Sequence, residues 1–359
     1  MKVRIFITVI IGVFAGTKAI TQTLVNDYEN PIYTALPFLR LIPDTKVSGM
    51  GDAGLATFNT NAVFLNGSAN VFSVDTSGVA LNYKSSGSRL LSLSGFHHLG
   101  IKNVITAGLR YNDLGNSSYS TANGLQTVGS YEYTLDVHYS RKLSDRIASG
   151  ITLKYIYSKI AEGMIVNGLE MSPASVLAAD LSMFYKNDIT LNQKPTVFTC
   201  GMVLANLGDK ITYTSSLYEQ YIPSDLGIGI ALNTQLNEIN GLELALDIHK
   251  LLVPTIRYSD QTVLEGALAS FNDAPGGLTE ELKEITISAG LQYIYNQLIF
   301  IRCGYFYENP VKGPRKFFTA GAGIQYRDIQ FDVAYRFFNN TQQLVAEKVL
   351  SMTLSVALN

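Results

Sequence analysis

The stretch LELALDIH, residues 242–249, alternates strictly between apolar and polar side chains and decides what kind of fold this chain has. One face carries Leu242, Leu244, Leu246 and Ile248, and the other carries Glu243, Ala245, Asp247 and His249. A period of two residues is that of a β-strand, because successive side chains of a strand point to opposite faces. The stretch therefore predicts a strand with one apolar and one polar face.

The same alternation recurs along most of the chain, for example in YTLDVHYS (133–140) and IQFDVAYRFF (329–338). We expect fourteen strands, near 79–84, 90–97, 104–114, 131–140, 147–160, 174–185, 196–207, 225–233, 242–249, 285–295, 298–307, 317–327, 329–338 and 349–358. An even number of antiparallel strands of about ten residues is typical of an outer-membrane barrel.

A pair of soluble β-sandwich domains is the alternative, since their strands also alternate. Most of the expected strands are longer than the five or six residues usual in globular proteins. The connections also alternate in length: those at 141–146, 295–298 and 326–330 are short, and those at 115–130, 161–173, 208–224 and 250–284 are long. Short turns on one side and long loops on the other favour an all-β, 14-stranded antiparallel transmembrane β-barrel.

The composition and the first residues agree with an exported membrane protein. The chain is 47% hydrophobic and 16% charged, and its formal charge of −2 gives no basic surface for nucleic acid. Residues 1–19 have the basic start, apolar run and small residues of a signal peptide. We expect residues 20–75 to form a periplasmic or plug segment and residues 76–359 to form the barrel with long extracellular loops.

The segment SGMGDAG, residues 48–54, contains the pattern G-x-G-x-x-G, which in a nucleotide-binding protein lies between a strand and a helix. Prolines precede it and no helical pattern follows it, so the nucleotide interpretation fails. Our hypothesis is that residues 31–72 enter the barrel from the periplasmic side as a plug with tight turns. The residues expected to shape these turns are Pro43, Asp44, Gly49, Gly51, Asp52 and Gly54.

No residue pattern indicates catalysis, a metal or a cofactor. The four histidines, His97, His98, His138 and His249, have no metal-ligand spacing, and no G-x-S-x-G motif is present. Cys200 and Cys303 lie in strand-like segments, where they either pack as apolar residues or pair in a disulfide. We therefore expect no enzymatic activity.

Two longer stretches resemble a known family. FLRLIPDTKVSGMGDAG (38–54) and the run from DAPGGLTEELKEI to AGAGIQY (273–326) are similar to the PorV family of Bacteroidetes outer-membrane proteins, which belong to the type IX secretion system. Shorter similarities lie at 139–158 and 201–232. The resemblance implies a fourteen-stranded barrel of the FadL type in the outer-membrane lipid.

The resemblance also implies a non-enzymatic role in protein transport. Members bind the C-terminal signal domains of exported proteins, associate with a large SprA-like translocon barrel and deliver cargo to a PorU-like sortase complex. Carried onto this chain, the partner-binding residues would lie in the longest loop: Asp273, Ala274, Pro275, Gly276, Gly277, Glu280, Glu281 and Glu284. A solvated charge run is the alternative interpretation of these acidic residues.

The chain departs from the family pattern at two places. Residues 65–68 read LNGS where the family has WNPA, and the chain ends in SVALN without a terminal aromatic residue. Both departures leave open a diverged paralogue. The alternative function is a FadL-like channel for uptake of hydrophobic small molecules, because one fold can host either function.

Overall fold

The computed structural model describes residues 30–121, 124–160, 162–166, 168–214, 219–255, 261–313, 315–338 and 349–358. The chain separates into two units, 1–30 and 31–359, and the description below concerns the second. The expected signal peptide at 1–19 lies outside the described residues.

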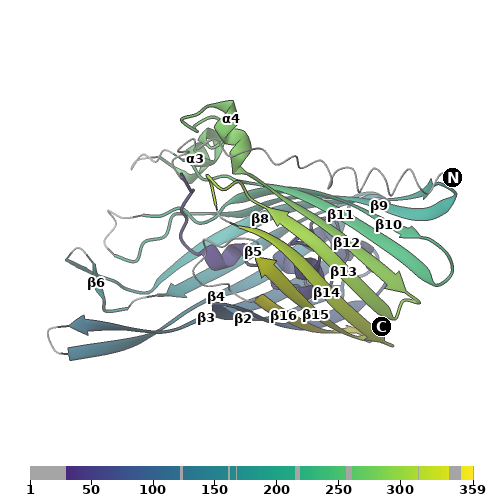
Figure 1. Ribbon diagram of the computed structural model, residues 1–359, viewed down its shortest axis with the longest axis horizontal. Helices are drawn as coiled ribbons and strands as arrows, with labels where there is room; N and C mark the ends of the chain where they lie inside the picture. Colours follow the sequence, from purple (N-terminus) through teal and green to yellow (C-terminus); the bar gives the residue numbers. More distant parts are fainter. Residues whose placement is uncertain are drawn as a thin grey trace. The chain divides into compact units, whose positions relative to one another are not determined.

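Fourteen strands close into one antiparallel barrel, as the sequence predicts (Figure 1). They are β1 (Ser77–Ser86), β2 (Ser88–His98), β3 (Asn103–Thr121), β4 (Gly124–Lys142), β5 (Ile147–Lys159), β8 (Ala174–Leu191), β9 (Lys194–Gly208), β10 (Asp225–Gln235), β11 (Asn240–Leu251), β12 (Ile285–Tyr295), β13 (Ile299–Tyr307), β14 (Lys316–Tyr326), β15 (Ile329–Phe338) and β16 (Val349–Leu358). β1 pairs with β16 to close the ring, and the short strands β6 (Ile165–Val166) and β7 (Leu169–Glu170) form a separate hairpin.

Along the wall strands, large apolar side chains mostly face outward and polar side chains mostly face inward, with inward exceptions such as Ile156 and Phe184. In β11, Leu246 and Ile248 are exposed, whereas Glu243 and Asp247 are almost completely buried. This is the arrangement of a membrane barrel, in which lipid covers the apolar outer face and the interior is polar. The alternation that predicts the strands therefore also gives their orientation in the wall.

The two ends of the barrel differ in their connections. At one end, here called the short-turn end, the links are brief; those after β8 and β12 use left-handed residues, such as Asn192 and Asn296, that tight hairpin turns require. The opposite end, the long-loop end, carries the connection between β11 and β12. One expectation was wrong here: most of 115–130 is a hairpin formed by extensions of β3 and β4 and not an irregular loop.

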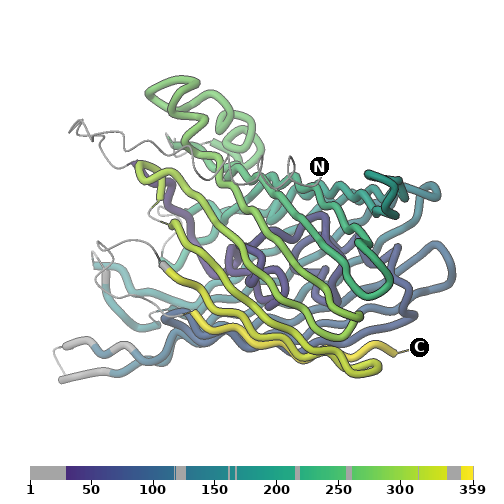
Figure 2. The backbone as a smooth tube through the Cα atoms, turned by 45° about the vertical axis from the view of Figure 1, so that its right-hand side comes forward, coloured from purple at the N-terminus to yellow at the C-terminus, as the bar shows by residue number. Residues whose placement is uncertain are grey.

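The segment that precedes β1 lies inside the ring of strands (Figure 2). It contains η1 (Pro37–Arg40), α2 (Thr45–Gly49), η2 (Ala62–Phe64) and η3 (Gly67–Phe72). α2 contacts β13 to β16, whereas η3 contacts β3, β4, β5 and β8 on another part of the wall. Contacts with both arcs place the segment in the interior; we call residues 31–72 the inner segment.

The connection between β11 and β12 contains two short helices, α3 (Val263–Ala269) and α4 (Leu278–Glu281), followed by η4 (Leu282–Glu284). Thr262 and Glu265 form a reciprocal capping box that fixes the start of α3. None of the described helices is long and apolar enough to cross a membrane.

Candidate functional site

Side chains of the wall hold the backbone of the inner segment. Asp247 of β11 accepts hydrogen bonds from the backbone N–H groups of Gly54 and Leu55 at 2.6 and 2.9 Å. The Thr319 hydroxyl of β14 accepts from Gly51 N and donates to Gly49 O, both at 2.9 Å. These buried contacts satisfy backbone groups that would otherwise lose their water partners inside the barrel.

The inner segment approaches the wall so closely that side chains are excluded at the crossing. Gly51 has a φ of +69°, in the left-handed region, and lies against Tyr305 and Gly304 of β13. A Cβ atom at Gly304 would collide with the backbone N of Gly51. The glycines of SGMGDAG therefore permit a tight turn against a strand, and they bind no nucleotide phosphate in this position.

Two aspartates of the same segment have defined partners. Asp44 caps α2 by accepting from Val47 N at 2.8 Å, and its second oxygen accepts from Asn61. Asp52 forms an ion pair of 2.9 Å with Arg336 of β15. Pro43 is buried directly before the cap. All six residues expected to shape the turns thus lie within the barrel, and both aspartates anchor the segment.

The path of the inner segment differs from the expectation of entry at the periplasmic mouth. Its first residues lie at the long-loop end, where Ala35 N donates to Tyr221 O. Leu36 and Phe38 are buried there against residues such as Ile156 and Ile222. At its other end, Val71 packs with Phe96 and Ala148 close to the short-turn end. The segment thus runs along the length of the interior.

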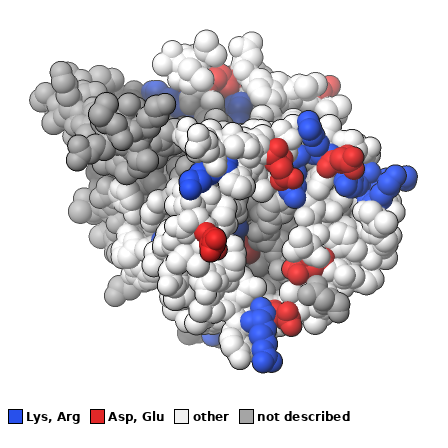
Figure 3. Space-filling view, turned by 90° about the vertical axis from the view of Figure 1, so that its right-hand side faces the viewer, with Lys and Arg blue, Asp and Glu red and all other residues white. Residues whose placement is uncertain are grey.

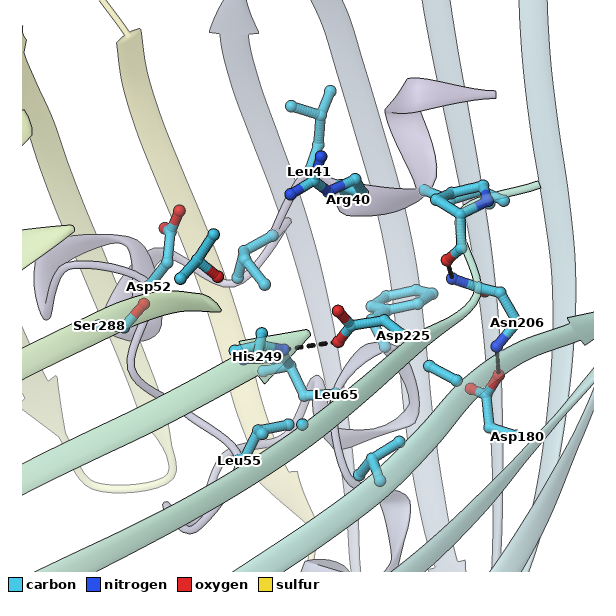
Figure 4. A pocket seen from close by; sticks show the side chains of 18 of the residues that line it. Arg40, Leu41, Asp52, Leu55, Leu65, Asp180, Asn206, Asp225, His249 and Ser288 are labelled. Atoms are coloured by element: carbon cyan, nitrogen blue, oxygen red, sulfur yellow. Dashed lines mark hydrogen bonds and ion pairs between the residues drawn. The ribbon is translucent and has the colours of Figure 1, made fainter. Parts of the chain in front are cut away.

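A cavity of about 100 Å³ remains between the inner segment and the wall (Figure 4). The segment contributes Arg40, Leu41 and Leu55, and the wall contributes the His249–Asp225 pair with an Nδ1–Oδ2 distance of 2.6 Å. Asp180 sits at a bulge between β8 and β9, pairs with Lys154 and accepts from Asn206 N. Charged groups thus dominate the polar lining of this space.

A second cavity, of about 460 Å³, lies toward the short-turn end. Its lining includes Phe58, Asn70, Gln292 and Gln330 from the inner segment and the wall. The face that carries the short turns is hollowed, and charged side chains of both signs are scattered around the hollow (Figure 3). A polar vestibule of this kind is ordinary for a barrel interior.

At the long-loop end, the partly buried Lys250 and the buried Lys312 fix the base of the loop formed by residues 252–284. Lys250 at the end of β11 contacts Glu281 and Glu284 at 2.9 and 2.6 Å. Lys312, from the link between β13 and β14, contacts Glu280 and Glu284 at 2.5 and 3.0 Å. We call this group of five residues the loop-base cluster.

The charges of this region are stabilised in their ionised forms. Burial opposes ionisation of Glu281, but hydrogen bonds from Ala274 N and Lys250 outweigh it and hold the pKa of Glu281 below its ordinary value. Burial acts likewise on Glu308, whose pKa is lowered by a two-point hydrogen bond from Arg315. These carboxylates are therefore charged and internally paired.

The loop residues expected to contact a partner divide into two groups. Ala274, Glu281 and Glu284 are buried, and Glu280 is half-buried and paired with Lys312. Exposed backbone lies at Pro275, Gly276 and Gly277, and Asp273 is half-buried beside them. The acidic side chains therefore form ion pairs within the structure and are not the groups that the loop exposes.

The exposed part of the loop includes five large apolar side chains. Its outward side chains are Leu264, Leu268, Phe271, Leu278 and Leu282, with exposed fractions from 49% to 75%. We call these five residues the apolar loop surface. Sequence reasoning missed it, although the capping box and the i, i+4 spacing of Leu264 and Leu268 indicate an amphipathic turn of helix.

A family model described as "Type IX secretion system protein PorV" matches residues 24–258, which is more than half of the chain. The chain belongs to the PorV family. Together with the barrel fold, membership places this PorV-family protein in the outer membrane as a component of type IX secretion. No curated protein matches it significantly.

Solved structures similar to this PorV-family chain are FadL-like barrels. The toluene transporter TodX from P. putida shares 12% sequence identity, with a TM-score of 0.51, over 88% of this chain and 98% of that chain. The toluene transporter TbuX from Ralstonia pickettii shares 10% identity over 88% and 98%, with a TM-score of 0.50. Identities of this size establish the fold alone.

Within the described residues, no group of three or more His, Cys, Asp or Glu side chains could hold a metal ion. His138, a lumen residue as expected, packs against Gly67 and hydrogen-bonds Thr152. Both cysteines are free, and Cys303 is exposed on the outer face of the wall. The disulfide alternative is thus excluded in this structure.

Proposed function

We propose that this protein is a plugged binding scaffold of the type IX secretion system and not a conduit. It binds the C-terminal signal domains of exported proteins, associates with a large SprA-like translocon barrel and delivers cargo to a PorU-like sortase complex. The protein binds its partners by non-covalent contacts, without catalysis and without a cofactor.

The single observation that carries the proposal is the way in which the inner segment occupies the lumen. Its backbone is tied to β11 by Asp247 and to β14 by Thr319, and Asp52 is tied to β15 by Arg336. A passage for solutes would require several of these buried contacts to break together. This supports residues 31–72 as a permanent plug, with binding carried out at the ends of the barrel.

The long-loop end is the better candidate for partner binding, and we assign it to the outside of the cell. Short periplasmic turns and long external loops are the rule for such barrels. The apolar loop surface is held in place by the loop-base cluster, so a partner would meet pre-organised side chains. The Asp273–Gly277 turn borders this surface and supplies exposed backbone groups.

The size and lining of the interior cavities give little support to the alternative function, uptake of hydrophobic small molecules. Ligand sites for small apolar molecules are usually at least about 300 Å³ and largely apolar. The cavity beside Arg40 is about 100 Å³ and lined by Asp180, Asp225 and Arg315. The second cavity, of about 460 Å³, is large enough, but most of its lining residues are polar, such as Asn70, Gln292 and Gln330. The toluene transporters share the fold with this chain, and toluene transport is a property of those proteins.

The test is a pull-down from native membranes through a tag in the short turn at 141–146, followed by mass spectrometry. The wild type should recover a very large translocon barrel and proteins with C-terminal signal domains. Leu268→Glu should reduce that recovery, because it places a charge in the apolar loop surface. Ile101→Glu is the matched control, since Ile101 is 88% exposed in the link between β2 and β3 at the opposite end.

Two outcomes would contradict the proposal. Recovery of the barrel alone, with a bound fatty or aromatic ligand, would favour the uptake channel. Unchanged recovery of partners with Leu268→Glu and with deletion of 261–278 would move the binding surface away from this loop.

A further inference from the structure

The hairpin formed by β3 and β4 extends beyond both neighbouring strands. Pairing of β2 with β3 ends at Arg89↔Asp113, and pairing of β4 with β5 ends at Tyr131↔Lys159. Beyond these points, residues 115–121 pair with 124–130 (Figure 1, far left). This projecting hairpin stands at the long-loop end.

Each strand of the projecting hairpin has one free edge in the described part of the chain. The register ends at Thr121↔Gly124, and the two residues that close a hairpin donate their N–H groups to each other's C=O groups. Every second pair along the hairpin does the same. The residues between them direct their backbone N–H and C=O groups outward. On β3 these are Asn116, Ser118 and Ser120, and on β4 they are Leu125, Thr127 and Gly129.

The projecting hairpin lacks the usual protection of free edges. No charged residue and no proline occurs from Leu114 to Ser130. Soluble edges and loops generally carry lysine, proline or inward charges that prevent pairing with other chains. A seven-residue uncharged edge, about 23 Å long at 3.3 Å per residue, is therefore a template for strand addition.

The two edges have different surroundings. Beside the β4 edge, the Ser130 hydroxyl donates to Ile160 O, where the long connection to β8 begins. Beside the β3 edge, β1 and β2 are joined through the single residue Gly87. On the β3 edge, Asn116 and Ser118 are exposed, and this edge is the candidate.

We propose that the β3 edge of the projecting hairpin, at Asn116, Ser118 and Ser120, binds an extended strand of the exported protein by β-augmentation. This inference rests on the proposed function, because it takes the exported C-terminal signal domain as the partner. Backbone pairing supplies affinity with little dependence on side-chain identity, which suits a scaffold that receives many different cargo sequences.

The test measures binding of a purified C-terminal signal domain to the full-length barrel in lipid nanodiscs. Ser118→Pro removes an outward N–H and blocks the β3 edge, whereas Thr127→Pro does the same to the β4 edge. Both substitutions delete one partner of the same exposed hydroxyl pair, Ser118–Thr127 at 2.9 Å. Ser118→Val deletes that pair and keeps the N–H group. Proline is tolerated in edge strands when its position faces away from the ladder.

We expect Ser118→Pro to weaken binding by about tenfold, because it removes one backbone hydrogen bond and its ring obstructs the approach of the added strand. Thr127→Pro and Ser118→Val should bind as the wild type does. Heat-modified mobility on gels checks that each variant forms the barrel.

Three results would overturn the inference. Equal affinity of Ser118→Pro and the wild type, with loss on deletion of 261–278, would leave the proposed function intact and remove the edge as its site. Loss with Thr127→Pro alone would refute the β3 assignment. Dimers of the barrel that Ser118→Pro abolishes, with no binding of the signal domain to the wild type, would show that the edge pairs with a second copy and that the proposed function also fails.

Discussion

The inner segment and the loop at 252–284 are both held against the barrel, but by different interactions. The backbone of the inner segment is hydrogen-bonded to Asp247 and Thr319. It packs directly against the backbone of the wall where both partners are glycines. The loop is tied through ion pairs of Lys250 and Lys312. Close packing of backbone against the wall allows one fit, and the Asp52–Arg336 ion pair adds to it, whereas the base of the loop depends mainly on ion pairs, which respond to charge, pH and salt. The comparison indicates a fixed inner segment and a loop whose attachment depends on charge.

The largest effect is expected from filling the closest contact of the fixed part. Gly304→Val would place a side chain where the backbone of Gly51 lies. We expect loss of the folded barrel or a fall in unfolding free energy beyond the about 1–3 kcal/mol typical of overpacking. The measurement is urea unfolding in lipid vesicles.

Cys303→Val is the matched control for this change. Cys303 is the preceding residue of β13 and is exposed on the outer face, so its substitution should have little effect. If both variants unfold alike, the inner segment does not fit the wall as described.

Next in size is removal of one cation from the loop-base cluster. Lys250→Met leaves Glu281 and Glu284 with less compensation in a buried site, which should destabilise the loop by about 3 kcal/mol. Hydrogen exchange should rise across 261–284 and stay unchanged in residues 44–57 of the inner segment. Lys142→Met, which removes a surface pair with the exposed Asp145, should not change exchange in the loop. An equal rise of hydrogen exchange in residues 44–57 and 261–284 would contradict separate attachment of the inner segment and the loop.

The third prediction tests the wall that carries both parts. Val333 faces outward in the middle of β15, opposite Met352 of β16. Val333→Arg should cost about 2–4 kcal/mol in vesicles, because it places a charge on the lipid face near the bilayer centre. Plug and loop should keep their hydrogen-exchange patterns at low denaturant. A neutral result would show that Val333 does not face lipid.

The smallest effect is expected from acid. Because the pKa of Glu281 is lowered in the folded protein, its contribution is complete above the unfolded value of about 4.3 and is lost as the pH falls through the lower folded value. Exchange in 261–284 should therefore rise below about pH 4 before the barrel unfolds. If hydrogen exchange in residues 261–284 rises only when the whole barrel unfolds, the loop is not held separately by its charges.

The sequence is sufficient for the wall because its signal is local. Alternation in segments such as 242–249 and 329–338 gives the strands, their faces and their number. The same criterion missed the ends of β3 and β4, since residues 115–130 are mostly Ser, Thr, Gly and Asn on both faces. Without a core on one side, no polarity pattern marks these strands.

The candidate site was less predictable because its contacts are distant in sequence. The sequence predicts Glu281 and Glu284 as partner-binding residues, with a solvated charge run as the alternative. Neither interpretation includes Lys312, which lies about thirty positions later and is brought beside them by β12 and β13. SGMGDAG could be recognised as a tight turn, but its neighbour Gly304 is about 250 positions away. The plug assignment of these residues stays a proposal, supported by those contacts.

The seam between β1 and β16 has a consequence for the order of assembly. The last strand pairs with the first, from Leu358↔Ser77 to Leu350↔Ser85, so the cylinder cannot seal until β16 has been delivered. By then the inner segment has long been synthesised and is joined to β1. The sheet must therefore close around the inner segment, and pairing of β16 with β1 is the last step of barrel closure.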